Sequence, residues 1–389
     1  ELRPYTRLNR IRTRRALAQE FMALRDEGIV FPRVAFPELS ESMRRVRPVG
    51  AVLGGEELLG FRELLATVEQ VLSFGSDESC KSCIRFRSLL SRMDPCSPLR
   101  RSLARSLDEE GELVDGASPA LARARQRIKT LGRRIIRMLE GLLADGDLGD
   151  VFQERFVTLR NGRQVVPVRR SSRNRVPGVV HDHSDSGQTV FVEPSGAVEL
   201  GNELASARLE ERDECRRIMA ELSDRVRGCL VVLIRNQKIL ARVDAAAAIS
   251  AWAVAYGCTL PRFSGELHLR QARHPLLAHQ LRQSGGGTVV PLDLTLDPAC
   301  RALIVTGSNS GGKTVALKTV GLLMVAAQCG LPIPVAEDSE LPLLEQVFAD
   351  IGDEQSLSQN LSTFTGHLTR IVGILRARAN CRTLVLLDE

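Results

Sequence analysis

The chain has 389 residues, of which 43% are hydrophobic and 26% charged, with 53 Lys and Arg against 47 Asp and Glu and a formal net charge of +6. This length predicts two or three globular domains. No uninterrupted apolar run approaches about 18 residues, which argues against a transmembrane helix, and no signal-peptide core follows Glu1. Nine scattered cysteines are typical of reduced thiols in the cytoplasm. An aromatic content of 4% argues against a stacking platform for single-stranded nucleic acid.

Residues 1–154 are expected to form a helical core domain. Apolar residues recur at steps of three, four and seven between Leu121 and Leu142, which places them on one face of a helix. Ser118 and Pro119 precede this stretch and suit its N-cap and first turn. Seven basic residues lie on the other faces with no acidic residue among them. They predict either an ordinary solvated face or a surface for nucleic acid or another acidic partner.

Residues 155–194, called the β-element below, are expected to form a small basic, clamp-like unit. The run from Phe156 to Val168 predicts a hairpin, because Asn161-Gly162 at its centre suits a type I′ turn. A second pair of strands is predicted within 178–192. Clustered arginines without acidic neighbours suit contacts with phosphates, and exposed loops that aid solubility are the alternative. The candidate contacts are Arg160, Arg163, Arg169, Arg170, Arg173 and Arg175.

Residues 195–258 are expected to form long lever helices. No proline occurs from the start of this range to Leu260, and apolar residues repeat at every fourth position from Ile218 to Leu230. A single helix of about 50 residues would be about 75 Å long at 1.5 Å per residue. Gly228 is predicted to divide it into an antiparallel pair of helices.

Residues 259–389 are expected to form an α/β domain that contains a phosphate loop. Strands are predicted in the apolar runs 289–294 and 302–306, and a helix is predicted after Thr314. The motif G-x-x-x-x-G-K-T lies between the second strand and the helix, which is the context that a phosphate loop requires. Its residues are Gly307, Ser308, Asn309, Ser310, Gly311, Gly312, Lys313 and Thr314.

These residue types predict a nucleoside triphosphate with Mg²⁺. Glycines let backbone N–H groups approach phosphates closely, and the N-terminus of the following helix adds a favourable dipole. Lys313 would reach the β- and γ-phosphates, and the Thr314 hydroxyl would bind Mg²⁺. No Asn-Lys-x-Asp tetrapeptide for guanine is present, so ATP is favoured over GTP.

The last six residues form a second motif that supports the first. Four apolar residues end at Leu387 and are followed by Asp388 and Glu389, which predicts a buried parallel strand that ends in two carboxylates. Asp388 would hold Mg²⁺ through water, and Glu389 would polarise the attacking water.

Together these motifs resemble those of the MutS family of ABC-type ATPases, and more closely its bacterial MutS-II branch, which lacks the mismatch-reading domain. The phosphate loop, the triplet Ser362-Thr363-Phe364 and the final Leu-Leu-Asp-Glu carry this resemblance in the ATPase. By its residues alone, the polar segment around the triplet is adequately explained as a surface loop. Further segments typical of the branch are 115–119, 163–168, 178–194, 272–277, 350–355 and 362–367.

The resemblance implies a mixed fold, with a mainly α-helical core and lever domain, the small β-element, and an α/β P-loop ATPase head of the ABC type. It implies a homodimer of heads that binds ATP and Mg²⁺ and encloses nucleic acid. Ser362 of one subunit, with Thr363, would complete the nucleotide site of its partner. Ser308 and Ser310 stand where the family usually has Pro and often Thr, and these small replacements are expected to be tolerated.

The chain is expected to be a fragment with a truncated head, because it begins without Met and ends at Glu389 within a motif. The segment that joins the two heads, the remaining sheet strands and the Smr nuclease domain of the family have no counterpart in it. The resemblance therefore implies an endonuclease only in the full-length protein, and it leaves ATP turnover by this chain open.

The resemblance implies an ATPase that acts on branched DNA, such as recombination intermediates, and opposes recombination. An alternative is a ribosome-associated ATPase that splits stalled or collided ribosomes, with the arginines on ribosomal RNA. A third is a structural clamp that binds ATP and hardly hydrolyses it. Arginine would contact phosphates in both DNA and ribosomal RNA, so the sequence does not distinguish the role on branched DNA from the role on ribosomes. A cytoplasmic protein associated with the nucleoid or ribosomes, without a membrane partner, is expected.

Two further groups of residues could suggest a metal or redox site, and we expect neither. Cys80 and Cys83 are two residues apart, but no second pair of cysteines accompanies them. His181 and His183 would share one face of a strand only loosely.

Overall fold

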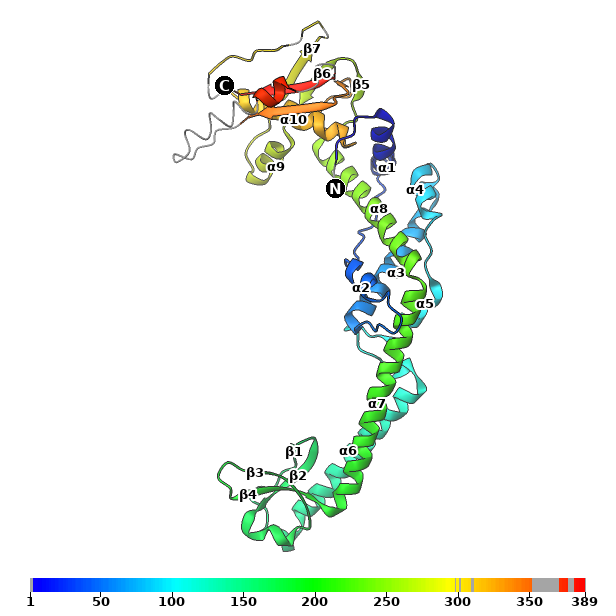
Figure 1. Ribbon diagram of the computed structural model, residues 1–389, viewed down its shortest axis with the longest axis vertical. Helices are drawn as coiled ribbons and strands as arrows, with labels where there is room; N and C mark the ends of the chain where they lie inside the picture. Colours follow the sequence, from blue (N-terminus) through cyan, green and yellow to red (C-terminus); the bar gives the residue numbers. More distant parts are fainter. Residues whose placement is uncertain are drawn as a thin grey trace. The chain divides into compact units, whose positions relative to one another are not determined.

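The computed structural model describes residues 3–297, 299–300, 302–308, 311–351, 371–376 and 381–388. Its contacts divide the chain into two compact units. The first unit comprises residues 1–34, 70–93 and 238–389, and the second comprises residues 35–69 and 94–237. The protein contains both helices and strands (Figure 1), which confirms the expected mixed fold class. The four-domain division stays a prediction.

The chain passes between the units at four points, of which two lie within helices, α3 (Gly55–Gly75) and α8 (Leu230–Tyr256). The first unit also contains the helices α1 (Leu8–Asp26), α4 (Ile84–Leu90), α9 (Pro275–Ser284) and α10 (Lys313–Gln328). Its strands are β5 (Arg262–Ser264), β6 (Leu267–Ala272), β7 (Leu292–Leu296), β8 (Glu340–Pro342), β9 (Gln346–Asp350) and β10 (Thr383–Leu387).

The second unit contains α2 (Ser40–Arg45), α5 (Ser97–Ser106), α6 (Pro119–Ala144) and α7 (Ser195–Gly228). Its strands are β1 (Thr158–Arg160), β2 (Arg163–Arg169), β3 (Gly178–His183) and β4 (Thr189–Pro194). Short 3₁₀ turns occur at Glu78–Cys80 in the first unit and at Asp115–Ala117, Gly146–Leu148 and Arg170–Arg175 in the second.

Helix α6 begins where the sequence predicts and packs along α7 in the antiparallel direction. Ser118 is the N-cap, and its hydroxyl accepts a hydrogen bond from the Leu121 amide at 3.0 Å. The same hydroxyl donates to Glu214 of α7 at 2.6 Å, and hydrogen bonds from Arg217 and Ser118 lower the pKa of Glu214 to about 2. The apolar stripe of α6 is buried, including Leu121, Ala124, Leu131, Ile135, Leu139 and Leu143.

The β-element is a four-stranded antiparallel sheet in the order β1-β2-β4-β3. Both predicted hairpins are present. Asn161 and Gly162 adopt positive φ angles of 49° and 77° between β1 and β2, as a type I′ turn requires. Every residue of β4 is buried, and its valines join the core formed by the apolar stripe of α6. The β-element is therefore attached to α6 by a shared core.

The lever helices differ from the prediction. Helix α7 ends at Gly228, as expected, and α8 begins at Leu230 after the single residue Cys229. In the part of the chain that the structure describes, however, α7 packs against α6 instead of folding back on α8, so the antiparallel pair is wrong. At the junction, the Cys229 amide still donates to the carbonyls of Arg225 and Val226. The backbone thus continues in helical pairing and makes no reversing turn.

The sequence argues against a transmembrane helix, and helix α8 has to be compared with that expectation. Among the described helices it alone has the length and composition to cross a bilayer, with a mean hydropathy of 1.4 in its most apolar window. Arg242 and Asp244 interrupt its apolar run, which is why a search for an unbroken run misses it. One such helix is weak evidence, because core helices of soluble proteins pass the same test.

The C-terminal part of the first unit contains a mixed sheet in the order β5-β8-β6-β7 and a parallel pair formed by β9 and β10. Helix α10 packs against β6 and β10 through buried residues that include Val320, Leu323 and Met324. Gly321 permits this approach, because a Cβ there would lie 2.6 Å from the Leu386 side chain.

The strand predicted at 302–306 is absent. These residues lead directly into the phosphate loop, but they belong to no strand, and Leu303, Ile304 and Val305 are 50%, 85% and 44% exposed. The structure describes no backbone hydrogen bond from this segment to a neighbouring strand. Apolar, β-branched composition favours a strand only where a partner supplies the hydrogen bonds.

The N-terminal segment packs on the end of α10, which the sequence does not predict. Buried Gln328, the last residue of α10, connects two segments at once. Its side-chain amide donates to the carbonyls of Tyr5 and Leu344 at 3.0 and 2.9 Å, and its carbonyl oxygen accepts from the Leu344 amide at 3.0 Å. The chain start and the segment before β9 are therefore both tied to the helix that follows the phosphate loop.

We predict that Gly178→Ala disrupts the β-element. A Cβ at Gly178 would lie 2.1 Å from the backbone carbonyl oxygen of Glu193, in the β3–β4 pair, and the backbone cannot move aside cheaply. We expect a loss of about 2 kcal/mol in the free energy of unfolding, measured by thermal or urea denaturation. Gly132→Ala is the matched control, since a Cβ there contacts nothing within 4 Å and should be neutral or stabilising in α6. Equal stability of both variants would contradict the close approach.

Candidate nucleotide and nucleic-acid sites

The phosphate loop ends on a helix N-terminus, as its motif predicts. Gly307 and Gly312 have φ angles of 155° and 81°, in a region that side chains rarely adopt. Gly312 is the N-cap of α10, so Lys313 is the first helical residue. The Gly311 amide donates to the Ser308 carbonyl at 2.9 Å and closes a turn in the loop. This geometry leaves the first amides of α10 directed toward the loop, which suits a phosphate group.

The two motifs meet at one contact. The Thr314 hydroxyl donates to Oδ2 of Asp388 at 2.6 Å, although the two residues are far apart in the sequence. Lys313 Nζ donates to the Gly307 carbonyl at 2.8 Å, so its ammonium lies over the loop. A hydroxyl, a carboxylate and an ammonium are thereby gathered at the start of α10. Oxygen ligands of this kind fit Mg²⁺, and the ammonium fits a phosphate.

Parallel pairing explains why Asp388 is there and identifies a residue that sequence reasoning missed. Strands β9 and β10 pair from Thr383–Gln346 to Leu387–Asp350, so their carboxyl ends lie at one edge. Asp350 is only 5% exposed, and its carbonyl accepts a hydrogen bond from the Asp388 amide at 3.0 Å. The signal in the sequence is the short apolar run Val347-Phe348-Ala349, which ends in the carboxylate of Asp350. By its residues alone, the polar segment that begins at Asp350 indicates a surface loop.

Some predicted site residues lie outside the described residues. These are Asn309 and Ser310 of the phosphate loop, Ser362 of the triplet, and Glu389. Their roles stay predictions.

His274 caps the helix that begins in the segment 272–277. Its Nδ1 accepts a hydrogen bond from the Leu277 amide at 3.3 Å at the N-terminus of α9. Burial, and to a lesser degree the positive charge of Lys318, lower the pKa of His274. Both effects favour the neutral ring, which is the form that can accept this hydrogen bond.

Most arginines of the β-element are engaged within the protein. Arg160 pairs with Asp182 at 3.2 Å and stacks over Phe191, with 4.5 Å from its guanidinium carbon to the ring centroid. Arg175 pairs with Asp150 at 2.8 Å. Arg173 donates to two backbone carbonyls at 2.8 and 2.6 Å and therefore supports the turn into β3.

Arg163 completes a buried ionic contact. The Glu193 side chain is 4% exposed and lies 3.3 Å from Arg163 and 2.7 Å from His181. A Cβ at Gly201 of α7 would lie 2.5 Å from this carboxylate, so Gly201 provides the space for it. His181 is thus explained by Glu193, and no group of three potential metal ligands exists among the described residues.

Arg169 and Arg170 differ from the other candidate arginines of the β-element, because they are exposed and their side chains are not engaged within the described part of the chain. They lie at the end of β2 and the start of the following 3₁₀ turn, and the structure describes no hydrogen bond or ion pair of their side chains. The basic face of α6 is likewise partly neutralised, because Arg125 pairs with Glu211 at 2.9 Å and Arg127 with Glu210 at 3.3 Å. Only some of the predicted basic surface remains available to a partner.

Cys80 and Cys83 show no sign of a metal or redox site. Both are buried free thiols, and burial raises the pKa of each. Burial of this kind slows the reactions of a thiol and is typical of core cysteines.

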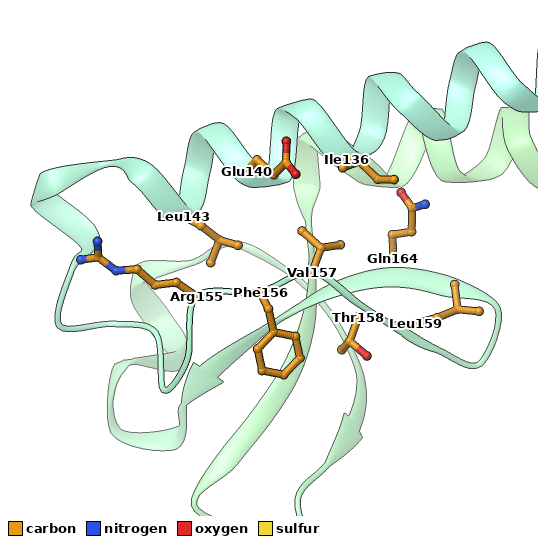
Figure 2. Close-up of a pocket in the computed structure, with 9 residues that line it drawn as sticks. All are labelled: Ile136, Glu140, Leu143, Arg155, Phe156, Val157, Thr158, Leu159 and Gln164. Atoms are coloured by element: carbon orange, nitrogen blue, oxygen red, sulfur yellow. The ribbon is translucent and has the colours of Figure 1, made fainter.

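A surface cavity of 480 Å³ lies between α6 and the β-element. Figure 2 shows Ile136, Glu140 and Leu143 of α6 on one side of it and Val157 and Gln164 on the other. Its lining is largely apolar and contains no glycine-rich loop or helix N-terminus, so it does not resemble a phosphate site.

Comparisons with known proteins agree with the motifs. The family model described as MutS domain V matches residues 303–389. The chain is 37% identical over 393 residues to a protein of Agathobacter rectalis named Endonuclease MutS2, which covers 100% of this chain and 48% of that protein. A protein of the same name from Halalkalibacterium halodurans is 36% identical over 399 residues, covering 100% and 49%. One from Pelotomaculum thermopropionicum is 40% identical over 349 residues, covering 87% and 42%. The chain spans about half the length of the curated relatives it matches.

We predict that the cap at His274 weakens on acidification. Because the pKa is lowered in the folded protein, the unfolded chain binds the proton more readily, and the stability present above about pH 6.5 is lost as the pH falls below it. His274→Asn keeps a good N-cap acceptor that does not titrate. The melting temperature of the wild type should therefore fall more than that of His274→Asn between pH 7.5 and 5.5. Parallel pH profiles would show that the ring does not act as the cap.

Proposed function

The chain belongs to the MutS family, in its MutS-II branch, and from this premise we propose that it binds and hydrolyses ATP and binds nucleic acid as part of a protein that acts on branched DNA. The proposed consequence is suppression of recombination at such intermediates, in the cytoplasm. Relatives carry the name Endonuclease MutS2, and we propose nuclease activity only for the full-length protein. The supporting observation is the contact between Thr314 and Asp388 at the start of α10.

The roles of the individual residues follow from that contact. The loop amides and Lys313 would bind the phosphates, and the Thr314 hydroxyl and Asp388 carboxylate would hold Mg²⁺. When bound, Mg²⁺ would neutralise charge on the phosphate oxygens. Asp350 lies beside Asp388 at the same edge of the β9–β10 pair. We propose Glu389 as the residue that orients the attacking water.

We propose that two heads associate around ATP. Ser362 of one subunit would complete the nucleotide site of the other, as the family resemblance implies. ATP would then favour the associated heads to the extent that it binds them more tightly than separate heads. That difference in affinity is the free energy available for closing the protein around nucleic acid.

The β-element is the proposed contact with nucleic acid. Arg169 and Arg170 are exposed and adjacent, and the structure describes no internal partner for their side chains, so they can neutralise phosphates without breaking an ion pair. Arg160, Arg163, Arg173 and Arg175 would act mainly by holding the fold of the element, because their side chains already contact carboxylates or carbonyls.

We predict that Lys313→Ala in the full-length protein weakens ATP binding on the order of 100-fold, because hydrogen bonds from an ammonium to phosphate are lost. Lys318→Ala is the control, since Lys318 lies on the same helix and is exposed. Isothermal titration with a non-hydrolysable ATP analogue measures both. Asp388→Asn keeps an acceptor for Thr314 but removes a charge, so it should abolish the gain in affinity that Mg²⁺ produces.

Three outcomes would contradict these assignments. Unchanged affinity in Lys313→Ala would remove the phosphate-loop assignment, and an unchanged Mg²⁺ effect in Asp388→Asn would remove the metal ligand. Equal ATP turnover by the wild type and Glu389→Gln would remove Glu389 from catalysis. Equal but negligible turnover would instead indicate a structural clamp that hardly hydrolyses ATP.

We predict that the Arg169→Ala and Arg170→Ala double variant binds a four-way DNA junction less tightly, with the slope of log affinity against log salt reduced by about 2. Arg105→Ala, an exposed residue of α5 outside the β-element, is the control and should leave the slope unchanged. Binding to matched duplex and to purified ribosomes is measured at the same salt, with and without the ATP analogue. ATP-dependent binding to ribosomes without preference for the junction would overturn the recombination role.

A further inference from the structure

Helix α5 lies against the junction of α7 and α8 within the second unit (Figure 1). Contacts at two places show in which direction the segment that contains α5 runs relative to α7 and α8. Near the end of α7, Arg225 donates to the Ser102 hydroxyl at 2.9 Å. In α8, the buried Asn236 side chain accepts from the Asp94 amide at 3.2 Å and donates to the Asp94 carbonyl at 2.6 Å. The segment 94–102 therefore runs antiparallel to the segment 225–236.

Two cysteines fall between these contacts on opposite sides of the interface. Cys96 lies between Asp94 and Ser102, and Cys229 lies between Arg225 and Asn236 as the single residue that separates α7 from α8. The neighbouring Cys229 thiol helps to raise the pKa of Cys96. Both are free thiols.

The backbone holds Cys96 in place. Its φ of 43° is in the left-handed region, which is uncommon for a residue with a side chain. Its amide donates to Oδ1 of Asp94 at 2.8 Å, and its carbonyl accepts from the Arg100 amide at 3.0 Å. Cys96 also stands at the N-cap of α5 without making a side-chain cap. Its thiol therefore makes no capping hydrogen bond to the helix.

The surroundings favour reaction at Cys229 first. Cys96 is 7% exposed, whereas Cys229 is half-buried and therefore the more accessible sulfur. Burial raises the pKa of Cys96 to about 12, and the guanidinium of Arg235 acts in the opposite direction. Nε of Arg235 is buried and has no hydrogen-bond partner among the described residues, so this cation can stabilise negative charge on the Cys96 sulfur when it attacks Cys229.

We propose that Cys96 and Cys229 are a redox pair that closes to a reversible disulfide when the protein meets a peroxide. The Cys229 thiolate attacks hydrogen peroxide, so that an S–O bond forms and the O–O bond breaks, giving a sulfenic acid. The hydroxide that leaves takes up the proton that the Cys229 thiol had lost and becomes water. The Cys96 sulfur then attacks the Cys229 sulfur, so that an S–S bond forms and the S–O bond breaks. The departing hydroxide takes up the Cys96 proton. Two thiols and one peroxide give one disulfide and two waters, and a dithiol reverses the reaction.

The disulfide would restrain the α7–α8 junction. It would join the start of α5 covalently to the one residue between the two helices, beside the hydrogen bonds at Ser102 and Asn236. A cross-link that closes a long loop also lowers the entropy of the unfolded chain. Oxidation would therefore hold the junction in the arrangement described here, and reduction would release it.

The test uses full-length protein that has been reduced, treated with increasing hydrogen peroxide and quenched with N-ethylmaleimide. Mass spectrometry of a non-reduced digest should find a peptide that joins Cys96 to Cys229 and is lost on adding dithiothreitol. The oxidised protein should melt several degrees above the reduced protein. Cys229→Ser and Cys96→Ser should each abolish the joined peptide and the shift. Cys215→Ser, at the other half-buried cysteine of α7, should retain both.

The wild-type digest decides the proposal even if a variant folds poorly. Oxidation of Cys229 to sulfinic acid while Cys96 is alkylated as a thiol would overturn it. A disulfide from Cys229 to any other cysteine would also overturn it.

Discussion

The apolar stripe of α6 has to be removed from water, and α7 is the helix that covers it. The antiparallel packing of these helices places Glu210, Glu211 and Glu214 of α7 beside Arg127, Arg125 and Ser118. The same stripe continues into the core of the β-element, so the sheet is held by the helix that precedes it. Because α7 is committed to α6, it does not fold back on α8. The end of α7 instead contacts α5 near Cys229.

The nucleotide site depends on a comparable constraint in the first unit. Helix α10 carries the phosphate loop at its start and buries its inner face on β6 and β10, where Gly321 allows close approach to Leu386. That packing aligns the start of α10 with the carboxyl end of β10. The contact between Thr314 and Asp388 is the result, and Asp350 reaches the same edge through β9. Packing of one helix on one parallel pair thus assembles residues from two motifs.

Fewer arginines are available to a partner than the composition suggests. An excess of arginine in the sequence invites the view that each is available to nucleic acid. In the structure Arg125, Arg160, Arg163 and Arg175 are paired with carboxylates, and such pairs would have to be broken before the side chain could neutralise a phosphate. Glu210 and Glu211, which pair with arginines of α6, come from α7, distant in the chain. Arg169 and Arg170 therefore carry the interface proposed for the β-element.

Local chemistry in the sequence was enough to predict the Ser118 cap, the Asn161-Gly162 turn and the phosphate loop before α10, because each depends on residues within a few positions of one another. Other features could not be predicted in this way. They are the extended segment 302–306, the course of α7 and α8, the role of Asp350, and the placement of Cys96 opposite Cys229. Each depends on a partner that is distant in the chain: a strand that supplies hydrogen bonds, a helix that covers an apolar stripe, or a neighbouring strand end. The motifs and their chemistry can therefore be recognised from the order of residues alone. Which motifs meet, and which charges are already neutralised, depends on long-range packing and is seen only in the folded chain.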